Sequence, residues 1–179
     1  MIIEQKIILL ENILQPKQSL LGDEYLGYRN HVYRMVHFCF LLQDCEEEQR
    51  QKILIAAAFH DLGIWLADTV DYLPPSIAAA QAYLQEQQLT AWSDEISLMI
   101  NEHHKIRAYT NNIYPLVEVF RQGDLVDFSL GTVRFGLNNT QVQTVKAAFP
   151  NANFHRNLGK RAWRWFLRNP LNPAPMIKW

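Results

Sequence analysis

Apolar residues recur three and four positions apart along most of the chain, which is the period of an amphipathic helix. The alternating apolar and polar positions of a half-buried strand are hard to find, and only seven residues are glycine. The pattern therefore predicts an all-α protein, a single helical bundle of six to eight helices in one domain over residues 1–179. The expected helices cover residues 2–14, 24–43, 50–63, 75–88, 92–104, 112–129, 138–148 and 158–168.

The segment KILIAAAFHDLG departs from amphipathic patterning. From Ile53 to Phe59 it is apolar on every side, which is typical of a helix buried at the centre of a domain. His60 and Asp61 then follow side by side, and Gly63 is the expected helix terminator. Because an unpaired carboxylate is costly to bury, Asp61 needs a metal cation, an arginine or a hydrogen-bonded histidine beside it.

Histidines interrupt the apolar faces of two further predicted helices. His31 shares a stripe with Met35 and Phe38, so it belongs to a row that faces the core. Taken alone, a histidine in such a row is more often a satisfied core residue than a metal ligand. His103 and His104 end the fifth expected helix, where both can face the core side.

Two carboxylates, Asp124 and Asp127, continue the apolar stripe of the helix expected at 112–129. Like charges in line repel each other unless a cation or a proton intervenes, so the pair indicates a metal ligand and a supporting neighbour. The inward-facing sites together combine imidazole and carboxylate groups. This mixture suits a divalent metal ion, namely Mn²⁺, Fe²⁺, Co²⁺, Ni²⁺ or Zn²⁺, with Mg²⁺ also compatible.

The order of these residues, a histidine, a His–Asp doublet and a later aspartate, resembles the HD-domain superfamily of metal-dependent phosphohydrolases. The signature of that superfamily, H…HD…D, is carried by an all-helical scaffold. The resemblance covers about residues 28–130, with a C-terminal helix and a proline-rich tail in 131–179. It implies that Asp127 orients a ligating histidine by accepting its second N–H. The metal ligands that it implies are His31, His60, Asp61 and Asp124.

The helix expected after the doublet, PPSIAAAQAYL, contains no histidine. The dinuclear branches of the superfamily have one there, so the resemblance implies one metal ion per chain. It also leaves His103 and His104 to contact phosphate, and it counts against the oxygenase members of the superfamily, which use two irons.

The resemblance implies a hydrolase that cleaves a phosphate ester of a small molecule, a nucleotide or a related metabolite. Besides Asp61, the residues Asp68 and Asp71 of the loop LADTVDYLPPS are candidates for a catalytic base or for orienting water, with a solvated loop as the plain alternative. The competing functions are a noncatalytic module that binds a nucleotide or a protein, and a metal-dependent oxygenase. The candidates for binding the phosphate of the substrate are Arg34, His103, His104 and Lys105.

Composition restricts the compartment and the partners. With 17 Lys and Arg against 18 Asp and Glu, overall charge favours neither a nucleic acid nor an anionic membrane. Cys39 and Cys45 form no disulfide framework, and we find no signal peptide and no membrane-spanning window. We expect a cytoplasmic protein with no nucleic-acid or membrane partner, and leave a homo-oligomer open. The segment GKRAWRWFLRNP is interpreted as a helix that packs its Trp face on the domain.

Overall fold

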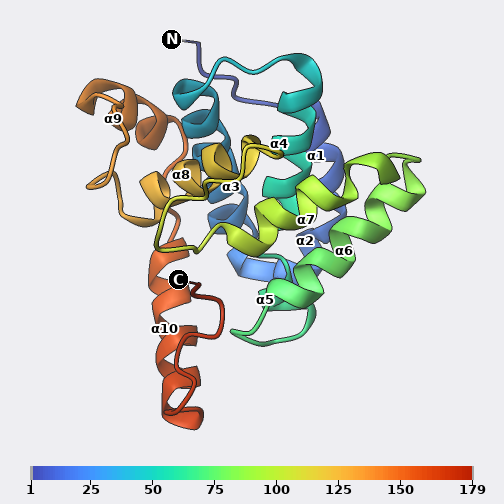
Figure 1. Cartoon of the computed structure of the whole chain (residues 1–179). Helices are drawn as coiled ribbons and strands as arrows, with labels where there is room; N and C mark the ends of the chain where they lie inside the picture. The colour runs from blue at the N-terminus through green and yellow to red at the C-terminus, as the bar shows by residue number, and fades with distance from the viewer. Residues whose placement is uncertain (1, 179) are drawn as a thin grey trace.

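The computed structural model describes residues 2–178, and within that range it contains helices and no β-strand (Figure 1). Seven of the helices have ten residues or more, which confirms the predicted all-α bundle. The α-helices are α1 (Ile8–Leu14), α2 (Gln18–Leu21), α3 (Tyr25–Leu42), α4 (Glu47–Phe59), α5 (Gly63–Leu66), α6 (Leu73–Glu86), α7 (Ser93–Glu102), α8 (Leu116–Phe128), α9 (Asn139–Ala148) and α10 (Phe154–Arg168).

Each of the eight expected helices has a counterpart, but the helix that was expected to end at Gly63 ends earlier. α4 ends at Phe59, so Gly63 does not terminate it as predicted and instead opens the short helix α5. A Cβ atom at Gly63 would lie 2.2 Å from the carbonyl oxygen of Tyr72 and 2.8 Å from Oγ of Ser76. Glycine is therefore required here because the start of α6 approaches the backbone closely, and the His–Asp doublet lies in the turn between α4 and α5.

Two helices form the centre of the bundle. Almost every residue of α3 from Gly27 to Cys39 is buried, and so is every residue of α4 from Ile53 to Phe59. α3 packs against both α4 and α8, and α4 packs against α7. Since neither central helix has a solvent-facing side in these stretches, any polar side chain there is enclosed by protein.

Helices α3 and α8 approach each other closely at Gly123. A Cβ atom at this position would lie 2.3 Å from Sγ of Cys39 and 3.0 Å from the carbonyl oxygen of Met35. Cys39 is a free, fully buried thiol, so it has no space into which it can retreat. The glycine thus sets the distance between the two helices that carry His31 and Asp124.

The C-terminal helix α10 extends away from the bundle, and the tail after it runs back along the helix (Figure 1). Trp163 is 61% exposed and Phe166 is 41% exposed, so the interpretation that the Trp face packs on the domain is wrong for this part of the helix. Trp165 is partly buried and donates a hydrogen bond from Nε1 to the carbonyl oxygen of Asn172. As expected, the proline-rich tail forms no regular helix.

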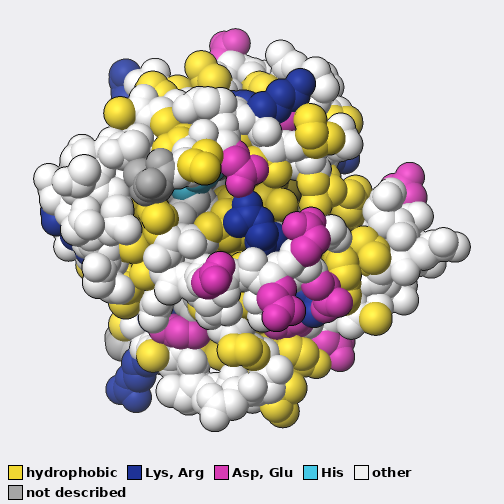
Figure 2. All heavy atoms as spheres, turned by 90° about the horizontal axis from the view of Figure 1, so that it is seen from above, with side chains coloured by type: hydrophobic (Ala, Val, Ile, Leu, Met, Phe, Trp, Pro, Cys, Tyr) yellow, Lys and Arg dark blue, Asp and Glu magenta, His cyan; other side chains and the backbone are white. Residues whose placement is uncertain are grey.

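Charged side chains of both signs lie close together on the face shown in Figure 2. Several acidic side chains gather on one part of this face, with basic side chains beside them (Figure 2), and the composition of the whole chain is balanced. None of the helices within residues 2–178 is long and apolar enough to cross a membrane.

We predict that Gly123→Ala lowers the free energy of unfolding by about 1–3 kcal/mol, because the added methyl group overpacks the α3–α8 contact. Denaturant unfolding measures the change. Gly159→Ala in α10 is the matched control, since a Cβ atom there meets nothing within 4 Å and alanine favours a helix. An equal loss of stability in both variants would contradict the close approach at Gly123.

Candidate metal centre

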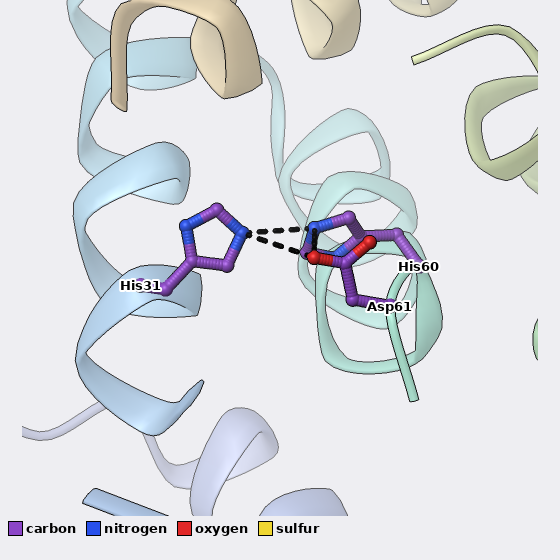
Figure 3. A group of neighbouring side chains, drawn as sticks. All are labelled: His31, His60 and Asp61. Atoms are coloured by element: carbon purple, nitrogen blue, oxygen red, sulfur yellow. Dashed lines mark hydrogen bonds and ion pairs between the residues drawn. The ribbon is translucent and has the colours of Figure 1, made fainter. Parts of the chain in front are cut away.

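Three side chains from two segments meet at the centre of the bundle (Figure 3). His31 comes from the middle of α3, and His60 and Asp61 follow directly after α4. The Nε2 atoms of His31 and His60 are 3.0 Å apart. Oδ2 of Asp61 lies 3.7 Å from Nε2 of His31 and 3.3 Å from Nε2 of His60. The three residues form one tight group of potential metal ligands.

Asp124 reaches the same point from α8. Its Oδ1 atom lies 3.5 Å from Nε2 of His31 and 3.8 Å from Nε2 of His60. All four predicted ligands are buried, with at most 3% of each residue exposed. The structure thus brings together the four residues that the sequence pattern selected.

The donor atoms of this group fit a divalent metal ion. Bonds of about 2.0–2.2 Å to nitrogen and oxygen place neighbouring ligands of one ion about 3.0–3.5 Å apart, close to the distances between these atoms. A mixture of imidazole and carboxylate is also the chemistry that such ions prefer. Asp61 belongs to a second group of potential ligands as well, with His103 and His104.

Three histidines present the same ring atom, Nε2, to the centre. Nδ1 of His60 donates to the carbonyl oxygen of Ala57 at 2.8 Å, and Nδ1 of His103 donates to that of Ile100 at 2.7 Å. Nδ1 of His31 lies 2.7 Å from Oδ2 of Asp127. Metal-binding histidines are typically oriented in this way by a carbonyl or carboxylate at the other nitrogen. The contact expected for Asp127 is present.

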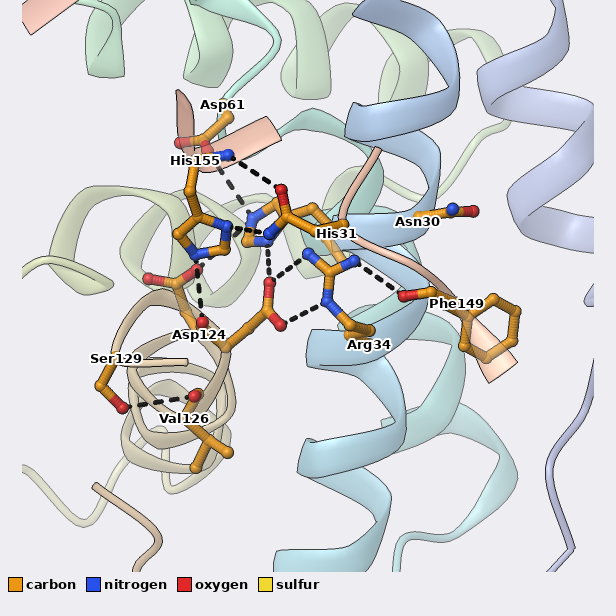
Figure 4. A network of polar contacts seen from close by, with 12 residues as sticks. Asn30, His31, Arg34, Asp61, Asp124, Val126, Ser129, Phe149 and His155 are labelled. Atoms are coloured by element: carbon orange, nitrogen blue, oxygen red, sulfur yellow. Dashed lines mark hydrogen bonds and ion pairs between the residues drawn. The ribbon is translucent and has the colours of Figure 1, made fainter. Parts of the chain in front are cut away.

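Arg34 does not lie where the sequence analysis expected it. Its Nε and Nη2 atoms donate to the two carboxylate oxygens of Asp127 at 2.5 and 2.8 Å, and Nη1 donates to the carbonyl oxygen of Phe149 at 3.0 Å (Figure 4). The side chain is buried and does not line the cavity beside the cluster. The prediction that Arg34 binds phosphate is therefore wrong. Arg34 holds Asp127, and Asp127 in turn holds His31.

Burial and charge act against each other in the cluster. Burial disfavours the charged form of His60, yet the carboxylate of Asp61 raises the pKa of His60 to about 9. Burial also works against the ionised form of Asp61, but the charge on His60 holds its pKa well below the usual range. For Asp124, burial raises the pKa of the carboxyl. The carboxylates thus need positive charge, and a bound divalent ion would supply it in place of a proton on His60.

Two buried atoms beside the cluster have no hydrogen-bond partner. They are Oδ1 of Asp61 and Nε2 of His103, which lie 3.5 Å apart. The two atoms can pair with each other only when Nε2 of His103 carries a proton, and a bound ion or a substrate atom would otherwise complete both.

The remaining predicted site residues fall into two sets. His104 and Lys105 line the cavity, and Nε2 of His104 lies 2.5 Å from the hydroxyl oxygen of Tyr72. Burial lowers the pKa of His104 well below its usual range. Asp68 and Asp71 are exposed and lie outside the cavity lining, and Asp68 instead pairs with Arg161 at 3.1 Å. The structure does not bring these two aspartates to the cluster.

A cavity of about 500 Å³ lies against the cluster, and several of its residues had no signal in the sequence pattern. The ring of Phe154 stacks on that of His31 with centroids 4.2 Å apart. Nε2 of His155 donates to the carbonyl oxygen of Asp127 at 3.2 Å. Tyr72 and Met176 also line the cavity. Phe154, His155 and Met176 lie after residue 130, so the His–Asp pattern gave no reason to select them.

Comparisons of the chain with protein-family models, with curated proteins and with solved structures give no match. The resemblance of the His–Asp pattern to a known family is therefore carried by the residues alone. His31 on α3, the doublet after α4 and Asp124 on α8 occur in that order along the chain and meet in space.

We predict that Arg34→Met lowers the free energy of unfolding by about 3–5 kcal/mol, because it leaves the buried carboxylate of Asp127 without its arginine. Thermal and denaturant unfolding measure the loss. Asp68→Asn is the control, since the side chain of Asp68 is 93% exposed and loses only its pair with Arg161, and an exposed pair contributes about 0–1 kcal/mol. Similar losses in the two variants would show that burial of the Arg34–Asp127 pair is unimportant.

Proposed function

We propose that the protein is a metal-dependent phosphohydrolase of the HD type, which cleaves a phosphate ester of a small molecule. The observation that carries the proposal is the convergence of two imidazole Nε2 atoms and two carboxylates at one buried point beside a cavity. His31, His60, Asp61 and Asp124 would hold one divalent ion. The order of these ligands along the chain, which resembles the HD superfamily, supports the hydrolase assignment.

A bound ion of this kind supplies Lewis acidity to a phosphoryl oxygen and lowers the pKa of a coordinated water. Hydrolysis joins the water oxygen to phosphorus, breaks the P–O bond of the ester and moves one proton from the water to the leaving oxygen. We assign the transfer of that proton to Oδ1 of Asp61 and Nε2 of His103, since both atoms are buried at the site and make no well-formed hydrogen bond. His31 is kept in place by Asp127 and Arg34.

The phosphate of the substrate is bound by groups at the edge of the cluster. Nδ1 of His104 lies 3.9 Å from Oδ2 of Asp124, and Lys105 follows it along the cavity wall. Lys105 also lines the cavity whose floor carries two carboxylates, and its ammonium group lies 3.5 Å from Oε2 of Glu102. Asp68 and Asp71 have no part in this proposal, because both side chains are exposed to solvent away from the cluster.

Two other functions compete with hydrolysis. A noncatalytic module that binds a nucleotide or a protein has no need for a complete set of donors, whereas all four donors meet here and the rings of His31 and His60 are held through Nδ1. A metal-dependent oxygenase of this superfamily would use two irons. The segment after the doublet has no histidine. In the second group of potential ligands, Nε2 of His104 is already in contact with the hydroxyl of Tyr72.

We predict that removal of the metal abolishes hydrolysis and lowers the midpoint of thermal unfolding, because Asp61 and Asp124 are then uncompensated. A panel of phosphorylated metabolites is screened with Mn²⁺, Co²⁺, Ni²⁺ and Mg²⁺, and the active preparation is then treated with a chelator. Elemental analysis should give close to one divalent ion per chain. Full activity after chelation would exclude the proposed chemistry. A protein with no metal and no turnover would be a binding module, and two irons would indicate an oxygenase.

We also predict that Asp124→Asn loses most of the metal and nearly all activity, whereas Asp127→Asn keeps the metal. Asp127 contacts the metal-facing ring of His31 only through Nδ1, so its loss should reduce turnover by about 10–100-fold. Elemental analysis and kcat are compared at a temperature where circular dichroism shows both variants folded. The opposite ranking in metal content would show that the final ligand lies one turn later in α8.

A further inference from the structure

The cavity beside the cluster has two chemically different parts. Its floor carries the imidazole and carboxylate groups of the candidate metal centre, together with Tyr72. Its wall is built by residues from four regions of the chain, namely the segment after α7, α8, α10 and the C-terminal tail, and none of these residues is a ligand of the His–Asp pattern. The apolar wall residues include Ile106, Leu125, Phe128, Leu158, Met176 and Ile177.

The polar groups near this wall already have partners. Nδ1 of His155 accepts from the side-chain amide of Asn151 at 2.5 Å, and its Nε2 donates to the carbonyl oxygen of Asp127. The backbone N–H of Ile106 donates to the carbonyl oxygen of Lys178, and that of Ile177 donates to Ala174. The wall therefore has few groups with which to pair the donors and acceptors of a nucleobase.

A nucleobase against this wall would lose hydrogen bonds to water without replacement, which costs binding free energy. An alkyl, prenyl or aryl group has no such cost and gains from burial in proportion to its apolar area. A cavity of about 500 Å³ is within the usual range for sites that enclose a small organic ligand.

We infer that the cavity takes a phosphate ester of an apolar group, with the phosphate on the metal-binding floor and the apolar group along the wall. This inference rests on the proposed hydrolase function for the role of the floor. It replaces the nucleotide that the family resemblance suggested with an alkyl, prenyl or aryl phosphate.

The test measures binding without turnover. Alkylphosphonic acids from ethyl to octyl, below the concentrations at which they form micelles, are titrated by calorimetry into the Mn²⁺-loaded protein. The Kd should fall by about three- to fourfold for each methylene that reaches the wall. A nucleoside 5′-phosphonate should bind more weakly than octylphosphonate. A Kd that does not change with chain length, or tighter binding of the nucleoside phosphonate, would overturn the inference.

Wall variants locate the effect. Ile106 and Phe128 are each 54% exposed, so Ile106→Gln and Phe128→Gln should fold normally. Each should weaken octylphosphonate binding by about tenfold or more and leave ethylphosphonate nearly unchanged. Leu167→Gln is the control, because Leu167 is 63% exposed on α10 and lies outside the cavity lining. An equal effect of the control would mean that general surface hydrophobicity, not the cavity, binds the chain, and the inference would fail.

Turnover separates this inference from the proposed function. Hydrolysis of nucleoside monophosphates with a higher kcat/KM than octyl phosphate would support the proposed hydrolase and contradict the apolar substrate. Chain-length-dependent binding without hydrolysis of any phosphate ester would contradict the hydrolase and support the inferred class of ligand.

Such a phosphate occurs both as a soluble ester and as a lipid headgroup. Helix α10, whose Leu158 and Ala162 line the cavity, also exposes Trp163 and Leu167 beside basic residues, so both sources are tested. Octyl phosphate in solution is compared with phosphatidic acid in phosphatidylcholine vesicles. Turnover of the vesicle substrate assigns a lipid, turnover of octyl phosphate alone assigns a soluble ester, and turnover of neither alongside an active nucleotide reaction refutes the inference.

Discussion

The structure depends on compensating the charge of three carboxylates, those of Asp61, Asp124 and Asp127, which are buried inside an apolar helical bundle. Asp127 is compensated by the guanidinium of Arg34 and by the ring of His31, which together hold its pKa below the usual range although burial acts in the opposite direction. Asp61 and Asp124 are paired instead with the imidazoles of His31, His60 and His103. The charge of Asp127 is thus compensated by an arginine, whereas Asp61 and Asp124 lie among imidazoles in a cluster that could hold a metal ion.

Rigid elements place the donor atoms. α3 and α8 are held at a close distance by Gly123, and they carry His31 and Asp124. His60 and Asp61 lie in a turn whose geometry depends on Gly63, where the start of α6 approaches the backbone. Because each ring is oriented through Nδ1, small rotations of one side chain cannot occur without breaking a buried hydrogen bond. The nitrogen donors of His31, His60 and His103 are therefore held in fixed positions.

The cavity links this polar centre to the C-terminal part of the chain. Phe154 stacks on His31, and His155 contacts the carbonyl oxygen of Asp127, so the start of α10 is packed directly against the groups that orient the site. The tail then adds Met176 and Ile177 to the wall. A polar floor with an apolar wall favours a ligand that is itself divided into a charged end and an apolar end.

The sequence by itself determined the helical class, the approximate extent of eight helices and the polar residues on core-facing positions, because the 3.6-residue period places such positions directly. The choice of four ligands among those residues came from the order that resembles the HD superfamily. The same period could not show what a polar group contacts across the bundle. Arg34 lies on a buried stretch of α3, and only the tertiary structure decided that its partner is Asp127, 93 residues away. Likewise, Asp68 and Asp71 are near the doublet in sequence, but the turn directs them to solvent. Long-range packing, not local periodicity, also brought the C-terminal residues to the cavity wall.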